Sequence, residues 1–316
     1  MNCLTITLNA AIDATYVVER LQHGGVNRVL RKHEMPGGKG NNVARVLAAR
    51  DHVVTASGFL GGDSGKFIES GLREAGIEPR FIWLETAVSR TCHTVLEQET
   101  GVATEILETG PTITGHDCDR FLAQLPKLMA AADVVVISGS APAGATPAFL
   151  EQVAKVARMG TPLLVVDSSG QSLISLLAGG PDLIKPNEAE LRALMNRPGS
   201  RHDQIGFVQN ELIGRHLAPD ARVVMSLGQE GAMLITSSSS LHARAPQVDT
   251  VNSVGCGDAL LAGFIDGWLD GLSDPESLEL AVACGTGAAL QEVAGVVDDR
   301  DVDRLRSGVD VVEYGC

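Results

Sequence analysis

A glycine-bracketed turn late in the chain carries the residue types that phosphate chemistry requires. Gly255 and Gly257 flank Cys256, Asp258 follows, and the apolar run Ala259–Phe264 begins at once. Such a turn at the start of a helix points several backbone N–H groups at one spot, where they bind a phosphate or a developing oxyanion. Asp258 would there accept the proton of an attacking hydroxyl group. An ordinary helix N-terminus with an aspartate in its first turn is the alternative interpretation.

A second glycine-rich segment, residues 36–45, leads directly into a helical pattern. Lys39 offers a positive charge to a phosphate group, and Asn42 offers a side-chain amide to a hydroxyl group. The segment is not a dinucleotide-binding fingerprint, because Val43 stands where that motif needs its third glycine. We therefore expect this segment to bind a small polar ligand that carries a phosphate.

Two further motifs each allow two interpretations. Asn187 and Glu190 have the spacing of a helix capping box, which explains them completely. The alternative is that both residues order a hydrated Mg²⁺ ion between nucleotide phosphates. The segment Ser226–Ala232 is typical of a strand–turn–strand hairpin, and its glycines could also cradle phosphates.

The composition limits the classes of partner. The chain has 316 residues with 44% hydrophobic and only 3% aromatic content, so we expect a large core of aliphatic side chains. Its formal net charge of −14 argues against nucleic acid or an anionic membrane as a partner. The start of the chain does not resemble a signal peptide and no apolar run is long enough to span a membrane, so we expect a cytoplasmic protein. The six cysteines show no metal-ligand spacing, so we expect neither a zinc site nor a disulfide framework. They are Cys3, Cys92, Cys118, Cys256, Cys284 and Cys316.

The elements that would position these residues alternate along the chain. Apolar runs typical of strands buried on both faces occur at Leu4–Leu8, Val53–Ser57, Val134–Ser138, Pro162–Asp167, Leu183–Lys185 and Val223–Leu227. Helical periodicity occurs at Asn42–Arg50, Gly65–Ala75, Asp117–Ala131, Pro147–Met159 and Glu188–Met195, with later helices at Ala259–Gly271 and Glu276–Gln291. This alternation predicts a doubly wound α/β fold with a mainly parallel sheet, whose ligands bind beyond the carboxyl ends of the strands.

Two stretches interrupt the alternation. Residues 14–34 and 80–108 contain β-favouring segments and lack helix signals. We expect them to form a small β-sheet lid on one domain that spans residues 1–316. Paired lids would leave no unpaired sheet edge, so a homodimer through the lid is also expected.

With these motifs in hand, the chain resembles the ribokinase/PfkB family of sugar kinases over essentially its whole length. The glycine-rich segment at 37–45 and the turn at 255–258 match the two family signatures in order, with Asn187 and Glu190 between them. Within the family the chain is most similar to the branch acting on hexose phosphates, which includes 1-phosphofructokinases and tagatose-6-phosphate kinases. It departs from the family at Ala10, usually proline, and at Cys256, usually alanine or serine.

The resemblance implies a function and a set of site residues. The function is transfer of a phosphoryl group from ATP, with Mg²⁺, to a ketohexose monophosphate, giving the bisphosphate. Asp258 would be the base, and the N–H groups of Gly255, Cys256 and Gly257 would form the anion hole. The sugar phosphate would contact Asp13, Arg28, Gly38, Lys39, Asn42, Arg90 and Ser140. ATP would contact Lys185, Asn187, Ser226, Gly228, Gly231 and the surroundings of Cys284, with Mg²⁺ held through water by Asn187 and Glu190.

Two other functions remain open at this point. One is a kinase of an unphosphorylated sugar or nucleoside, for which the charge of Lys39 would have no purpose. The other is a regulator that binds nucleotide or sugar phosphate without catalysis, which an intact Asp258 and Glu190 disfavour. Residue types do not decide between fructose 1-phosphate, fructose 6-phosphate and tagatose 6-phosphate.

Overall fold

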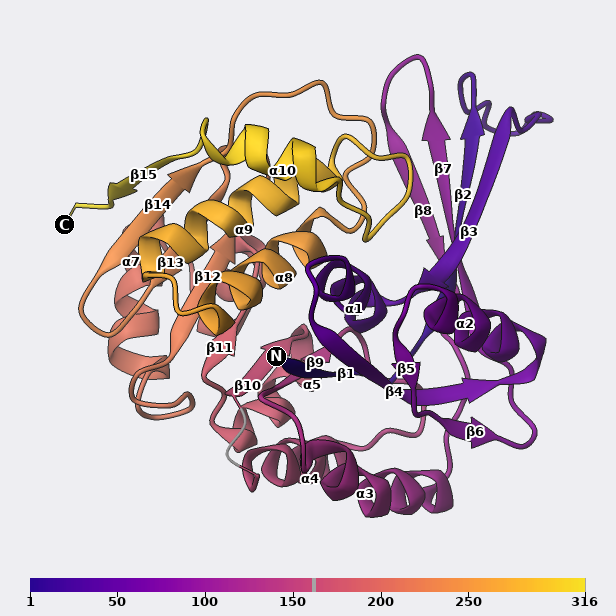
Figure 1. The fold of residues 1–316 in the computed structure, drawn as a ribbon, viewed down its shortest axis with the longest axis horizontal. Helices are drawn as coiled ribbons and strands as arrows, with labels where there is room; N and C mark the ends of the chain where they lie inside the picture. The colour runs from indigo at the N-terminus through magenta and orange to yellow at the C-terminus, as the bar shows by residue number, and fades with distance from the viewer. Residues whose placement is uncertain (161–162, 316) are drawn as a thin grey trace.

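The computed structural model describes residues 1–160 and 163–315. Its centre is a sheet of eleven strands in the order β15-β14-β13-β12-β11-β10-β9-β1-β4-β5, with β6 also paired to β4 (Figure 1). The strands are β1 (Asn2–Thr7), β4 (Val53–Gly61), β5 (Glu78–Pro79), β6 (Ile82–Leu84), β9 (Val134–Ser138), β10 (Leu163–Asp167), β11 (Leu183–Ile184), β12 (Arg222–Ser226), β13 (Ala232–Ile235), β14 (Ser240–Arg244) and β15 (Asp310–Glu313).

The sheet is parallel from β12 through to β6 and antiparallel at its other edge. The inner strands β1, β9, β10, β11 and β12 pair in parallel register, for example Val166 beside both Ile137 and Ile184. Strands β13, β14 and β15 add to β12 as antiparallel neighbours. The inner strands are continuous apolar runs because helices cover both faces of the sheet.

The helices form one layer on each face of the sheet (Figure 1). One layer holds α1 (Lys39–Ala49), α2 (Gly62–Glu74), α8 (Cys256–Leu269), α9 (Asp274–Ala288) and α10 (Asp299–Arg306). The other holds α3 (Gly115–Met129), α4 (Pro147–Arg158), α5 (Gly170–Leu176), α6 (Glu188–Met195) and α7 (Arg201–Phe207). Short helical turns are η1 (Leu177–Gly179), η2 (Val208–Leu212) and η3 (Gly228–Glu230).

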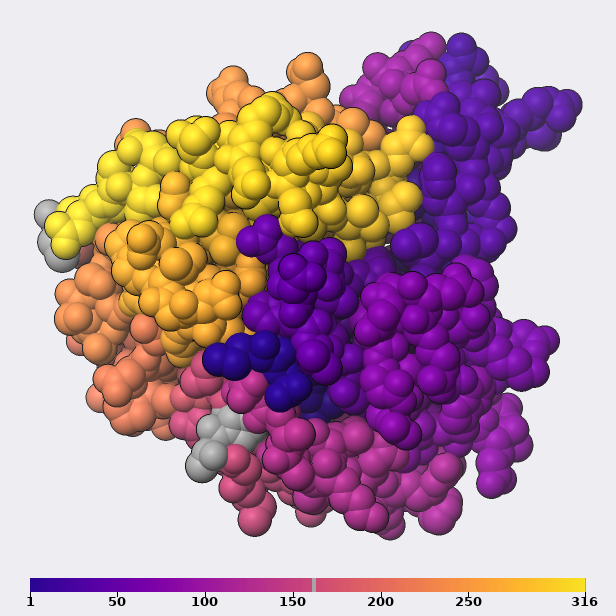
Figure 2. Space-filling model, viewed as in Figure 1, coloured from indigo at the N-terminus to yellow at the C-terminus, as the bar shows by residue number. Residues whose placement is uncertain are grey.

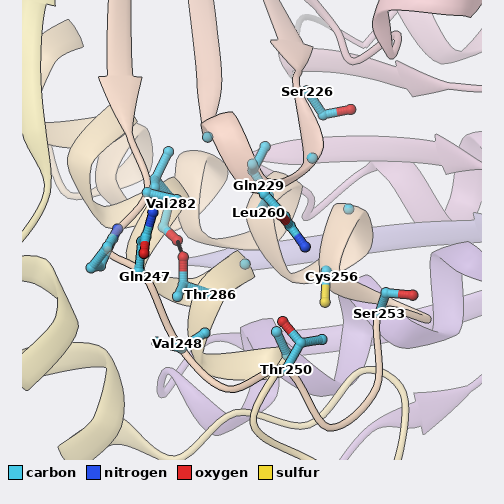
Figure 3. A pocket seen from close by; sticks show the side chains of 17 residues that line it. Ser226, Gln229, Gln247, Val248, Thr250, Ser253, Cys256, Leu260, Val282 and Thr286 are labelled. Atoms are coloured by element: carbon cyan, nitrogen blue, oxygen red, sulfur yellow. Dashed lines mark hydrogen bonds between the residues drawn. The ribbon is translucent and has the colours of Figure 1, made fainter. Parts of the chain in front are cut away.

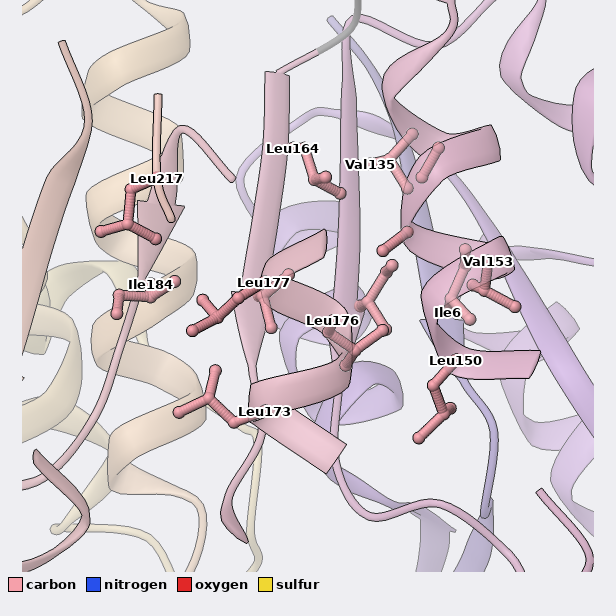
Figure 4. Close-up of a cluster of buried hydrophobic side chains, with 14 of the residues drawn as sticks. Ile6, Val135, Leu150, Val153, Leu164, Leu173, Leu176, Leu177, Ile184 and Leu217 are labelled. Carbon is pink, nitrogen blue, oxygen red and sulfur yellow. The ribbon is translucent and has the colours of Figure 1, made fainter. Parts of the chain in front are cut away.

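Alternation along the strands divides the core between the two faces. In β9, Val134 and Val136 pack toward α1 and α8, while Val135 and Ile137 pack toward α3 and α4. Figure 4 shows part of the second cluster, where leucines of α4 and α5 cover the sheet. Aliphatic side chains of this kind make up most of the core, as the low aromatic content predicts. Within the described residues no helix is both long and apolar enough to cross a membrane.

A second sheet of four strands stands apart from the body, at the upper right of Figure 1. Its order is β3-β2-β7-β8, formed by β2 (Ala11–Val18), β3 (Arg31–Gly37), β7 (Arg90–Glu97) and β8 (Ala103–Leu107). We call these four strands the lid sheet. Both segments predicted for the lid contribute to it, although β6, within the predicted range 80–108, pairs with β4 of the central sheet instead.

The predicted fold class is confirmed, and most predicted elements lie within a few residues of their predicted ends. Val134–Ser138 and Glu188–Met195 have the predicted bounds, whereas helix α1 begins at Lys39, three residues before the predicted start. The first residue of the strand predicted at 162–167 and the last cysteine, Cys316, lie outside the described residues. The five cysteines in the described part of the chain are free.

Candidate active site

The turn at residues 255–258 is the N-terminus of helix α8. Gly255 has φ 82°, in the left-handed region, and a β-carbon there would lie 2.8 Å from the backbone nitrogen of Gly295. Only glycine fits both conditions without strain. The N–H groups of Gly255 and Gly257 have no acceptor within the described residues, whereas that of Cys256 makes a long 3.5 Å contact with the Ser253 carbonyl. The turn therefore presents backbone donors that an anion could occupy.

Asp258 lies in the first turn of α8 and is only 5% exposed. Its Oδ2 accepts a 2.8 Å hydrogen bond from the side-chain amide of Asn42 in α1. Burial, reinforced by the negative charge of Asp167, raises the pKa of Asp258 to about 6, against the opposing effects of Lys39, Asn42 and Lys185. A carboxylate with such a pKa is ionised at neutral pH and still basic enough to take a proton.

Asp167 is a site residue that the motifs did not indicate. It ends β10, is fully buried, and its Oδ1 lies 3.3 Å from the Lys185 ammonium and 3.8 Å from the Lys39 ammonium. Its Oδ2 accepts a hydrogen bond from Ser138, which is 3.2 Å away at the end of the neighbouring strand β9. The sequence signal was its place at the carboxyl end of a predicted buried strand.

The two lysines beside Asp167 face the turn. Asp167 is the main cause that raises the pKa of Lys39, with further contributions from Asp258 and Glu190. A β-carbon on Gly257 would lie 3.4 Å from Lys185 Nζ. Lys185 is thus beside the backbone donors, at the end of α8 where the helix dipole also favours negative charge.

Arg45 of α1 is the last residue of the glycine-rich segment, but the motif gave it no role of its own. It is 7% exposed, and it donates to Asn42 Oδ1 at 2.9 Å, to the carbonyl of Pro36 and to the carbonyl of Ala294. Burial lowers its pKa, although Asp13 and Asp258 oppose this effect. Arg45 therefore fixes the amide of Asn42 and so orients the donor that reaches Asp258.

Asp13 lies on β2 of the lid sheet, close to the glycine-rich segment. A β-carbon on Gly37 would overlap the Asp13 carboxylate, so the glycine allows this approach. Burial raises the pKa of Asp13, while Arg45 and the Gly38 and Asn42 donors lower it. Asp13, Gly38 and Asn42 are therefore brought together beside Asp258.

Arg90 and Ser140 also meet, at a third residue, Asn9. The Arg90 guanidinium donates to the Asn9 carbonyl at 3.2 and 3.1 Å and lies 3.5 Å from Ser140 Oγ. The Asn9 amide donates to the Ser140 hydroxyl at 3.3 Å. This group joins the ends of β1, β7 and β9. Lys39, expected in the same pocket, has its charged partners at Asp167, Asp258 and Glu190 instead.

Two residues expected in the site, Arg28 and Cys284, do not contact the site residues described above. Arg28 is exposed in the loop between β2 and β3, without a hydrogen bond or ion pair to any described residue. Cys284 is fully buried in α9, where it packs with Leu280, Val302 and Leu305. Its sulfur also lies against α8, where a β-carbon on Gly263 would come within 2.8 Å of it, so the side chain is enclosed between α8 and α10 and does not line the cavity. The expectation that Cys284 itself contacts a nucleotide is therefore corrected.

A cavity of about 460 Å³ opens directly at the turn (Figure 3). Cys256 and Gly257 line one end, with Leu260 one helical turn further along α8, and Val248 and Val282 line the other end (Figure 3). The hairpin from β12 to β13 supplies Ser226, Gly228 and Gly231 to the lining. Of the surroundings of Cys284, the residues that reach the cavity are Val282, Gly285 and Thr286. A cavity with an apolar end and a polar, donor-rich end suits a nucleotide.

Asn187 and Glu190 form a capping box at the start of α6. Glu190 Oε2 accepts from the Asn187 N–H at 2.9 Å, and Asn187 Oδ1 accepts from the Glu190 N–H at 2.8 Å. Within the described residues no three His, Cys, Asp or Glu side chains cluster as metal ligands. Glu190 Oε1 stays available and acts electrostatically on Lys39. These residues fit Mg²⁺ bound mainly by water and phosphate, with one or two carboxylates, and not an all-protein cage.

Comparisons with known proteins agree with this fold. The family profile of pfkB family carbohydrate kinases matches residues 4–297. Tagatose-6-phosphate kinase from Staphylococcus epidermidis is 34% identical over 98% of this chain and 99% of its own. Crystalline phosphofructokinase-2 from Escherichia coli, in complex with substrates and products, is 27% identical with a TM-score of 0.89, covering 98% of this chain and 99% of its own. Ribokinase from Arabidopsis thaliana, 22% identical with a TM-score of 0.76 over 96% of this chain and 98% of its own, supports the fold alone.

The fold and these similarities define the class, a carbohydrate kinase built on the ribokinase-like α/β fold. More narrowly, the chain belongs to the PfkB family of carbohydrate kinases. The predicted family and the predicted enzyme class, a phosphotransferase, are thereby confirmed.

Proposed function

We propose that the protein transfers the γ-phosphoryl group of ATP to a hydroxyl of a ketohexose monophosphate and releases the bisphosphate and ADP. The observation that carries this proposal is the buried Asp258 carboxylate, held by Asn42 beside a turn with free backbone N–H groups. The names of the relatives, tagatose-6-phosphate kinase and phosphofructokinase, support a hexose phosphate as the acceptor.

In the proposed reaction, the acceptor hydroxyl approaches Oδ1 of Asp258, since Oδ2 is held by Asn42. The proton passes to Asp258 as the new O–P bond forms and the bond from phosphorus to the ADP oxygen breaks. Charge on the moving phosphoryl oxygens is stabilised by the N–H groups of Gly255 and Gly257 and by Lys185. Lys39, whose charged partners all lie at this centre, acts here as well.

The cavity in Figure 3 is the proposed ATP site. Val248 and Val282 would border the base, and the glycines of the β12–β13 hairpin allow the sugar and phosphates to approach the backbone. Mg²⁺, held near Glu190 and Asp167, would neutralise phosphate charge and orient the phosphate groups. Such an ion would keep most of its water ligands, because the described residues contain no cluster of three side chains that could ligate a metal.

The phosphate already on the acceptor is proposed to bind at Arg90 and Ser140. Arg90 is held in place by Asn9, so its guanidinium is oriented before the ligand arrives. Asp13 and Asn42 would hold sugar hydroxyl groups between this position and Asp258. Arg28 would complete the phosphate site only by movement of its loop or from a second copy of the chain.

A homodimer through the lid sheet is part of the proposal. Strand β8 exposes Ile106 and Leu107, at 60% and 58%, and the β2–β3 loop exposes Val26 at 82%. Apolar side chains at an unpaired sheet edge are suited to contact with a second copy. Sedimentation equilibrium should give twice the monomer mass, and Ile106→Lys should shift the protein toward monomer.

One experiment tests the acceptor. The ratio kcat/KM is measured side by side for fructose 1-phosphate, fructose 6-phosphate, tagatose 6-phosphate and unphosphorylated fructose, with ATP and Mg²⁺. We expect one hexose phosphate to exceed unphosphorylated fructose by about 10- to 100-fold, because a charged phosphate contact contributes roughly 1.5–3 kcal/mol. Equal or better turnover of the unphosphorylated sugar would overturn the proposed substrate class.

A further inference from the structure

The lid sheet is tied to the body of the protein by one carboxylate. Arg31 and His33, two positions apart on β3, point to the same side and meet Glu292, which follows α9. Arg31 Nη2 lies 2.7 Å from Glu292 Oε1, and His33 Nε2 lies 3.0 Å from Glu292 Oε2. The hydrogen bond from Arg31 lowers the pKa of Glu292, so this carboxylate is ionised at neutral pH. We call Arg31, His33 and Glu292 the lid latch.

The same residue holds the turn that carries the anion-hole donors. The backbone carbonyl of Glu292 accepts a 3.0 Å hydrogen bond from the Asn252 side-chain amide. Oδ1 of Asn252 accepts from the Val254 N–H at 3.0 Å, and its carbonyl faces the Cys256 thiol at 3.6 Å. Asn252 is only 1% exposed, so water does not replace these contacts easily. The segment that contains Glu292 therefore helps to hold the anion-hole turn in position.

The residues just after Glu292 reach the other helix of the site. Arg45 in α1 donates to the carbonyls of Ala294 and Gly295, and it also holds Asn42, the partner of Asp258. Residues 292–295 thus touch the lid, the turn and the helix that positions Asp258. Figure 2 shows this yellow C-terminal segment in contact with the indigo strand of the lid.

We propose that Glu292 is a positioning residue that couples closure of the lid sheet over the acceptor to the geometry of the anion-hole turn. This inference rests on the proposed function, in which the lid closes over a sugar phosphate. While Arg31 and His33 bind the Glu292 carboxylate, residues 292–295 are fixed and Asn252 holds the turn in place. When the lid opens, the carboxylate loses both partners, and the segment whose backbone carbonyl holds Asn252 loses one of its constraints. Phosphoryl transfer is then efficient only when the acceptor is covered, which disfavours transfer to water.

A second contact supports the coupling. The β7–β8 turn of the lid reaches the loop before Asn252, where a β-carbon on Gly101 would lie 3.6 Å from the Thr250 carbonyl oxygen. Thr250 also lines the cavity proposed for ATP. The lid sheet therefore meets the nucleotide side of the site at two places, through Glu292 and through Thr250.

A double-mutant cycle tests the latch in the full-length enzyme. Arg31→Gln, Glu292→Gln and the double variant are compared by kcat and KM for the hexose phosphate that the wild type uses. Glu292→Gln keeps the backbone carbonyl that Asn252 needs. We expect each single variant to lower kcat/KM roughly 5- to 20-fold and the double variant to be no worse than the poorer single variant. The Kd of a non-hydrolysable ATP analogue should stay within about twofold of wild type.

The matched control is Arg244→Gln. It removes an arginine–carboxylate pair of 3.3 Å with Asp310 between β14 and β15, at the exposed surface away from the lid. This variant should stay within about twofold of wild type, as is usual for an exposed ion pair. Single-variant losses that multiply in the double variant, or that equal the Arg244→Gln effect, would overturn the latch.

Amide hydrogen exchange separates failure of the latch from failure of the proposed substrate. Arg31→Gln changes only the lid, yet it should speed exchange in a peptide that covers residues 252–258 by about fivefold or more. Arg244→Gln should leave that peptide unchanged. If the wild type phosphorylates no hexose phosphate, the proposed function fails and the exchange result still decides the latch. Unchanged exchange in Arg31→Gln would refute the coupling whatever the substrate.

Discussion

The side-chain amide of Asn42 donates a 2.8 Å hydrogen bond to Oδ2 of Asp258, across 216 positions of sequence. Asn42 lies in the first turn of α1 and Asp258 in the first turn of α8, so the N-termini of both helices meet at this bond. Each helix dipole places partial positive charge there. The contact leaves Oδ1 as the oxygen of Asp258 that can face an acceptor hydroxyl.

Asn42→Ala should move the acid limb of the pH profile upward. The Asn42 donor lowers the pKa of Asp258, which burial raises to about 6, so its loss should raise this pKa further. A base with a higher pKa is ionised only at higher pH, so kcat/KM should begin to rise at a higher pH than in the wild type. The measurement is kcat/KM for the hexose phosphate from pH 5 to 9. An acid limb that stays at the wild-type pH would show that this bond does not tune the base.

Asp167→Asn should move the same limb in the opposite direction. The negative charge of Asp167 raises the pKa of Asp258, so neutralising it should lower that pKa and extend activity to lower pH. The variant should also lose maximal kcat, because Lys39 and Lys185 lose the carboxylate 3.8 and 3.3 Å away that positions them. Asp310→Asn, at the surface, serves as the control. A limb displaced upward would contradict the electrostatic account of the site.

Asp258→Asn should make the folded protein more stable at neutral pH. The folded pKa of about 6 lies above the ordinary 3.8, so the ionised carboxylate opposes folding above about pH 6. Below about pH 4 both states are protonated and the effect vanishes. The gain should be on the order of 1–3 kcal/mol at pH 7. Urea unfolding of both proteins at pH 7 and pH 4 measures it, and a loss of stability at pH 7 would oppose the assignment.

Arg90→Met should weaken binding of the acceptor sugar phosphate and leave binding of the nucleotide unchanged. Arg90 is held by Asn9 beside Ser140, away from the cavity proposed for ATP. Loss of a charged contact should raise KM for the hexose phosphate roughly 10- to 100-fold, with KM for ATP within about twofold of wild type. Turnover of an unphosphorylated ketohexose provides the internal control, because it should not change. A rise in KM for ATP alone would show that Arg90 acts on nucleotide binding and not on the acceptor phosphate.

The strands and helices that position the site could be read from apolar periodicity, because both faces of the inner sheet are buried. The two glycine signatures also predicted that segments 37–45 and 255–258 matter. Asp167 ends a predicted strand and Arg45 ends the glycine-rich segment, but neither pattern assigns a role to these two charged residues. Their roles come from contacts between elements distant in sequence.

The misplaced expectations have similar causes. The resemblance placed Cys284 near the nucleotide, but the helical period turns its side chain between α8 and α10 while Val282 and Gly285 face the cavity. The placement of Lys39 at the acceptor phosphate rested on its charge and on the resemblance, and it stays a prediction. Its position relative to Asp167 depends on how β10 and α1 pack, which residue types do not specify.

The most direct test of the account is turnover by Asp258→Asn, with nucleotide binding measured on the same sample. Asparagine keeps the shape of the side chain and can accept the Asn42 hydrogen bond, but it cannot take a proton from the acceptor hydroxyl. The account predicts a kcat for the hexose phosphate about 10²- to 10⁴-fold below wild type, with the Kd of a non-hydrolysable ATP analogue within about twofold. A kcat within about tenfold of wild type would contradict the claim that Asp258 is the base.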